Sequence, residues 1–127
     1  MLFRSSLEKV REARDVLLAA EQKSPANAQV LALLGSLHYE VPGSPIGFGN
    51  RNKAQDYLSR AVAADPAGRD TNFFMGDFLL SSGNSAEAVS YLEKALAAPQ
   101  QDDEVDRGRR GEISETLAKA KAKMKKR

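Results

Sequence analysis

The side chains that could carry catalysis or bind a metal ion are few in this chain. It has one histidine, His38, no cysteine and no paired-carboxylate motif. General acid–base and nucleophilic catalysis both need such groups at positions that tune their pKa values. His38 lies in the apolar run 33–39, so we expect a packed histidine rather than a catalyst or ligand. No other ligands stand at a metal-binding spacing. The sequence therefore predicts no catalytic residue, no metal site and no cofactor, and the chain is expected not to be an enzyme.

A second candidate for chemistry is the segment 41–49, which contains three glycines and two prolines. A phosphate-binding loop would need a strand before it and Gly-Lys-Ser or Gly-Lys-Thr after it, and neither is present. The segment is instead predicted to be a loop with fixed bends. Two interpretations stay open for Ile46 and Phe48. They form a partner-binding projection at the rim of the fold, or they plug the end of a helix pair.

Composition favours one all-α domain. The 127 residues are 42% apolar, which is too hydrophobic for a disordered chain, and alanine, leucine, lysine and glutamate dominate. No apolar run approaches the roughly 20 residues that cross a bilayer. Residues 1–6 do not resemble an export signal. We therefore expect a cytoplasmic protein from the sequence as it stands, or a periplasmic one if a leader has been removed.

Apolar periodicity predicts six helices separated by short breaks, near 3–23, 26–40, 50–64, 69–82, 85–98 and 105–124. Ser24 is expected to cap the second helix, with Pro25 in its first turn. Short breaks between helices indicate antiparallel neighbours. The acidic residues 102–104 place negative charge at the start of the last helix, where the helix dipole favours it.

The helices repeat at a fixed offset. Three small or apolar residues of one helix recur 34 residues later, and this is the length of one helix-turn-helix repeat: Ala54, Leu58 and Ala61 match Ala88, Leu92 and Ala95. A further match lies 41 residues before the first set, with the seven extra residues in the loop 41–49: Ala13, Leu17, Ala20 and Pro25 match Ala54, Leu58, Ala61 and Pro66. Such units cannot bury their apolar faces alone and must stack.

These positions resemble the tetratricopeptide repeat pattern. The first helices of the two copies carry Leu31, Leu34, Gly35 and His38, and Asn72, Met75, Gly76 and Leu79. The resemblance implies an α-α superhelix of about two and a half hairpins in a single domain, 1–127. Residues 1–25 form a half repeat, 26–66 and 67–100 form two repeats, and 101–127 form a capping helix and basic tail. The alternative is an ordinary helical bundle with coincidental alanines.

The resemblance also implies a concave groove lined by the first helix of each repeat, where a protein or peptide binds. The side chains there that avoid the packing positions are Gln29, Ser36, Tyr39, Glu40, Asp70, Phe73 and Asp77. Phe73 and Phe74 point to different sides, and we expect Phe74 to pack and Phe73 to face the groove. The groove lacks the lysine and arginine pairs that would clamp a carboxylate or phosphate.

A narrower resemblance covers about residues 28–120. It is carried by Phe48-Gly49, Lys53-Ala54, Leu58, the run 76–80 and the run 95–99. These are similar to the T component of tripartite ATP-independent periplasmic transporters. That resemblance implies a periplasmic helical-repeat subunit that associates with a substrate-binding partner.

The basic excess of the chain lies in its last segment. Residues 104–127 contain nine lysines and arginines against four acids. A basic tail can bind nucleic acid, but this one lacks interleaved aromatics for base stacking, and a solvated helix end is the favoured interpretation. The sequence as a whole predicts a non-catalytic scaffold that binds another protein or a peptide. The alternatives are the transporter subunit and nucleic-acid binding through the tail, and a homo-oligomer is also open.

Overall fold

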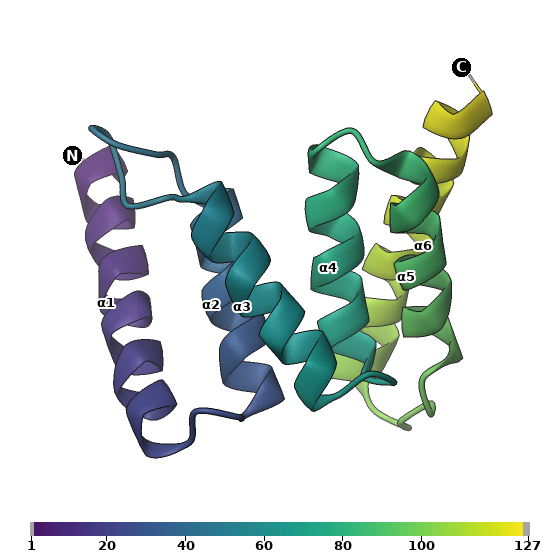
Figure 1. Cartoon of the computed structure of the whole chain (residues 1–127), viewed down its shortest axis with the longest axis horizontal. Helices are drawn as coiled ribbons and strands as arrows, with labels where there is room; N and C mark the ends of the chain where they lie inside the picture. The colour runs from purple at the N-terminus through teal and green to yellow at the C-terminus, as the bar shows by residue number, and fades with distance from the viewer. Residues whose placement is uncertain (1, 126–127) are drawn as a thin grey trace. The chain divides into compact units, whose positions relative to one another are not determined.

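The computed structural model describes the backbone of residues 2–125 and the side chains of residues 6–125, so Lys126 and Arg127 of the basic tail lie outside it. Within this range the chain forms six helices and no strand (Figure 1): α1 Leu2–Lys23, α2 Ala28–Glu40, α3 Arg51–Ala64, α4 Arg69–Ser81, α5 Ser85–Ala97 and α6 Glu104–Lys125. The predicted all-α repeat fold is confirmed. The largest boundary error is at the start of the second helix, expected at 26 and found at Ala28.

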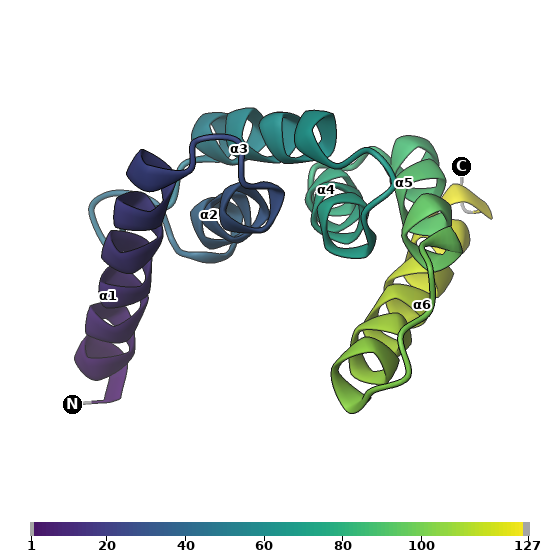
Figure 2. The same ribbon diagram turned by 90° about the horizontal axis from the view of Figure 1, so that it is seen from below.

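The chain divides into two compact units, Met1–Ala64 and Asp65–Arg127. The first contains α1, α2 and α3, and the second contains α4, α5 and α6. Figure 2 shows α2 with α1 on one side and α3 covering another. The arrangement of residues 1–127 as one domain stays a prediction.

In the first unit, α2 and α3 pack closely because the contact has a glycine on one side. Leu34, Ala54, Leu58 and Ala61 are all completely buried. A Cβ atom on Gly35 would lie 2.6 Å from the Leu58 Cγ atom, which is closer than real carbon atoms approach. The absent side chain therefore makes room for the leucine of the facing helix.

The second unit repeats this contact between α4 and α5. Ala88, Leu92 and Ala95 are completely buried, and a Cβ atom on Gly76 would lie 2.7 Å from the Leu92 Cγ atom. The offset in the sequence thus corresponds to the same packing in both units. On the other side of α5, the helix α6 buries Ile113 and Ala120 completely, whereas Met124 is 42% exposed.

The turns before α2 and α4 share a backbone hydrogen bond. The Asn27 N–H donates to the Ser24 carbonyl at 3.1 Å, and the Gly68 N–H donates to the Asp65 carbonyl at 3.2 Å. Each position in one turn lies 41 residues from its counterpart in the other. The junction between α1 and α2 is therefore built like the turn that leads into α4.

The cap of α2 differs from the prediction. Asn27, not Ser24, is the N-cap, and its Oδ1 atom accepts from the Val30 N–H at 3.0 Å. Pro25 lies in the turn before the helix rather than inside it. Ser24 is excluded as the cap because the turn places it three residues before Asn27.

Replacing Asn27 by alanine should lower the free energy of unfolding by about 1 kcal/mol, since the Val30 N–H loses its acceptor. Asn84 is a matched control because it is the N-cap of α5 without a side-chain cap bond. Asn84→Ala should change the stability by less. Urea denaturation followed by circular dichroism measures both variants, and equal losses would contradict the assignment.

Candidate protein-binding site

An apolar trough of about 410 Å³ lies between α1 and α2 in the first unit. The walls are Ala13, Val16 and Leu17 from α1 and Leu33, Ser36 and Leu37 from α2. Val16 is 69% exposed although it is a large apolar residue. An exposed apolar surface of this kind, inside a hollow, is typical of a site that a partner covers.

One of the predicted groove residues, Ser36, lines the trough, and two others lie on the same stripe of α2. Gln29, Ser36 and Glu40 share one stripe of the helix with Leu33 and Leu37, because their spacing follows the helical turn. Gln29 and Glu40 are exposed at the two ends of the stripe. Tyr39 is half-buried on the neighbouring stripe.

Ser36 differs from the prediction of a polar contact. Its side chain is only 5% exposed, and its hydroxyl donates to the Leu33 carbonyl at 2.9 Å. The hydroxyl is already used inside the helix, so Ser36 shapes the wall of the trough and offers no donor to a partner.

The two interpretations of the segment 41–49 each describe one of its residues. Ile46 is 54% exposed and projects. Phe48 instead packs edge-on against the His38 ring at 5.5 Å between centroids, with the Arg14 guanidinium 4.5 Å above its own ring. The loop is closed at its base, where the Asn50 N–H donates to the His38 carbonyl at 2.8 Å.

His38 is a packed histidine, as expected. It is 6% exposed and stacks on the Tyr57 ring at 5.7 Å between centroids. Burial, reinforced by the nearby Lys53 charge, lowers the pKa of His38 below its ordinary value of 6.5, so the ring is neutral at pH 7. The Nδ1 atom of His38 is buried with no hydrogen-bond partner among the described residues.

The predicted groove residues of α4 lie mostly under α6. Phe73 is 5% exposed and Phe74 is 6% exposed, so the expected division between a groove ring and a core ring is wrong. The Arg109 guanidinium lies 4.9 Å from both ring centroids and 3.2 Å from Asp70. Asp70 and Phe73 are therefore occupied by a side chain of their own unit. Asp77 is half-buried.

A charged cluster that the sequence did not reveal anchors α6. Asp106 is completely buried. Its carboxylate accepts from Arg69 at 2.6 Å and from Arg110 at 2.8 Å. The Arg110 guanidinium also donates to the Leu96 and Ala98 carbonyls at 2.8 and 2.6 Å, at the C-terminal end of α5. Hydrogen bonds from both arginines lower the pKa of Asp106 from 3.8 to about 2.

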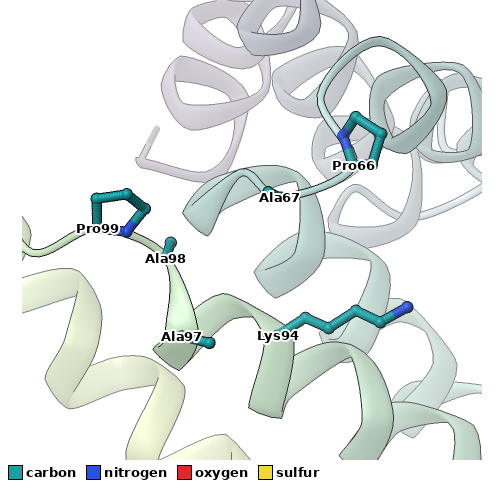
Figure 3. A pocket seen from close by; sticks show the side chains of 6 residues that line it. All are labelled: Pro66, Ala67, Lys94, Ala97, Ala98 and Pro99. Carbon is teal, nitrogen blue, oxygen red and sulfur yellow. The ribbon is translucent and has the colours of Figure 1, made fainter.

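The second unit has a smaller hollow of about 310 Å³ (Figure 3). Pro66 and Ala67, from the turn before α4, form one wall, and residues 97–99 form another. Lys94 is its one charged side chain. Among residues 6–125, whose side chains are described, no three His, Cys, Asp or Glu side chains gather as metal ligands. Among the helices described, none has the length and apolar character that crossing a membrane requires.

The comparison with known proteins identifies the repeat. A sequence model of the family described as Tetratricopeptide repeat matches residues 46–110. A coproporphyrin III ferrochelatase from Frankia alni is 39% identical over 87 residues, which cover 61% of this chain and 22% of the ferrochelatase. The chain thus spans about a fifth of that relative. Because the family match covers just over half of the chain, the protein belongs to the tetratricopeptide repeat family.

Proposed function

We propose that the chain is a non-catalytic scaffold that binds another protein or a peptide through the trough between α1 and α2. Tetratricopeptide repeats are generally protein–protein interaction modules. The observation that carries the proposal is the apolar lining of the trough, with Val16 left 69% exposed. Burying such a surface against a partner is favourable, at roughly 25 cal/mol for each Å² of apolar area removed from water.

Polar residues of α2 would contribute to the specificity of partner binding. Gln29 and Glu40 lie at opposite ends of the α2 stripe, where they can orient a partner along the helix. Ile46, which is exposed on the loop, stays a separate predicted binding residue. The predicted residues of α4 belong to the second unit and are not part of this trough. Asp77 stays a separate predicted binding residue.

The ferrochelatase likeness does not lead us to propose catalysis. It covers 22% of that enzyme, and the one histidine of this chain is buried against Phe48 and Tyr57. A role as a transporter subunit stays a prediction from the sequence.

Val16→Asp should remove partner binding without unfolding the chain, because the side chain is already 69% exposed and the aspartate puts a charge into the apolar contact. Val105→Asp is the matched control, since Val105 is 73% exposed in the second unit. Quantitative affinity purification with the wild type and both variants measures the result. Proteins lost with Val16→Asp and kept with Val105→Asp support the trough. An unchanged set of proteins with Val16→Asp overturns it.

A further inference from the structure

Within the described residues, the trough has the shape of a repeat without its first helix. In each complete repeat, a second helix buries one face against a first helix: α3 against α2, and α5 against α4. The three matched residues on that face are completely buried in both cases. Their counterparts on α1 are not, because Ala13 is exposed and Leu17 and Ala20 are half-buried. The helix α1 therefore has the sequence pattern of a second helix, but the face that carries this pattern is only partly buried.

The turn after α1 supports the same assignment. Two of its backbone hydrogen bonds, Asn27 to Ser24 and Leu31 to Asn27, match Gly68 to Asp65 and Asn72 to Gly68 in the turn that leads into α4, and α4 is the first helix of its repeat. The helix α2 is likewise a first helix, so α1 is the second helix of the half repeat before it. A first helix paired with α1 would also lie beside α2, and the trough is lined by these two helices.

We propose that an amphipathic helix of a partner protein occupies this trough and completes the half repeat. This rests on the proposed function and states the chemistry of the partner. In both complete repeats a glycine of the first helix faces the buried leucine of the second, Gly35 facing Leu58 and Gly76 facing Leu92. Leu17 is the corresponding leucine of α1. The partner helix therefore presents a glycine to Leu17, preceded by a large apolar residue, as Leu34 and Met75 precede the two glycines here. The first helices α2 and α4 are 13 residues each, and the partner helix needs a similar length.

The chain contains its own probe for this surface. A fluorescently labelled peptide of residues 26–41 contains the first helix α2, and a second peptide has Gly35→Leu. The glycine peptide should bind saturably, as measured by fluorescence anisotropy, and it should shift the methyl NMR signals of Ala13 and Leu17. The leucine peptide should bind at least about tenfold more weakly, because its extra side chain has no room against Leu17. A surface that binds apolar side chains without regard to their shape would bind the leucine peptide more tightly, since that peptide is more apolar.

The matched protein variants are Ala13→Glu and Ala19→Glu. Both alanines are exposed on α1, so neither change should unfold the helix, but only Ala13 lines the trough. Ala13→Glu should lower the affinity for the glycine peptide at least about tenfold, and Ala19→Glu should leave this affinity unchanged. Light scattering on the chain alone tests the other occupant, a second copy.

The outcomes separate this inference from the proposed function. The helix assignment is overturned if the two peptides bind equally well, or if the Ala13→Glu and Ala19→Glu variants bind the glycine peptide with equal affinity. A dimer that Ala13→Glu dissociates overturns it too, in favour of a second copy. If the peptides fail but Val16→Asp still loses captured proteins, the scaffold proposal stands and the completing helix does not.

Discussion

Gly76→Leu should lower the free energy of unfolding by about 3 kcal/mol, among the largest effects of a single substitution in this chain. Even the Cβ atom of the new side chain would lie 2.7 Å from the Leu92 Cγ atom, and 3.3 Å from the Ala88 carbonyl oxygen. Leu92 is completely buried, so it cannot move aside without displacing its own neighbours. The helices α4 and α5 must therefore separate to admit the leucine.

Gly111→Leu is the matched control in the same unit. Gly111 lies within α6, and a Cβ atom there would meet nothing within 4 Å. Glycine is a poor helix former, so this change should raise the stability by about 0.5–1 kcal/mol. Urea denaturation followed at 222 nm gives both values. Changes of the same sign at Gly76 and Gly111 would contradict the close approach of α4 and α5.

Asp106→Asn should loosen the packing of α6 against the end of α5. The amide keeps the size of the carboxylate but removes the charge that Arg69 and Arg110 share. Arg110 is then left without a carboxylate partner, and Arg69 keeps only Asp70. Arg110 would also lose the group that aims it at the Leu96 and Ala98 carbonyls. Hydrogen exchange should show faster exchange first in the α6 amides. Asp102→Asn is the control, because its ion pair with Arg107 is solvent-exposed at 3.5 Å and should contribute little. Slow exchange in α6 of the Asp106→Asn variant would contradict the anchoring role.

The same carboxylate predicts how the stability depends on pH. The pKa of Asp106 in the folded chain is about 2, below the ordinary value of 3.8, so the folded state binds this proton less tightly than the unfolded state. Its stabilising effect is complete above pH 3.8 and is lost as the pH falls toward 2. Thermal unfolding between pH 2 and 6 should therefore show a smaller acid loss for Asp106→Asn than for the wild type. Parallel pH profiles would rule out Asp106 as the titrating group.

The helices and their packing could be predicted because they depend on local patterns. The recurrence of alanine and leucine at a 34-residue offset specifies which face of α3 and α5 is buried, and it required no knowledge of distant contacts. The histidine could be placed in the core for a similar reason, since Leu33, Leu34 and Leu37 precede it in the same run.

The corrections concern side chains that meet across the fold. Arg109 covers Phe73 from a helix more than 30 residues away, and no periodicity indicates which arginine of α6 points inward. Asp106 has the same difficulty, because an aspartate in the first turn of a helix is ordinarily a solvated residue that favours the dipole. The exposure of Ala13 and Val16 could be suspected from the unpaired half repeat, but the trough itself needs the positions of α1 and α2.

The loop between α2 and α3 can change in length without disturbing the two helices. Its closing bonds join its own ends, with the Gly49 N–H donating to the Pro42 carbonyl at 2.9 Å and the Asn50 N–H donating to the His38 carbonyl at 2.8 Å. The helices on either side keep the packing of the second unit although seven extra residues lie between them. A foreign sequence grafted near Ile46 would therefore be displayed without changing the register of α2 against α3, which makes this loop a natural attachment point for an epitope or a reporter.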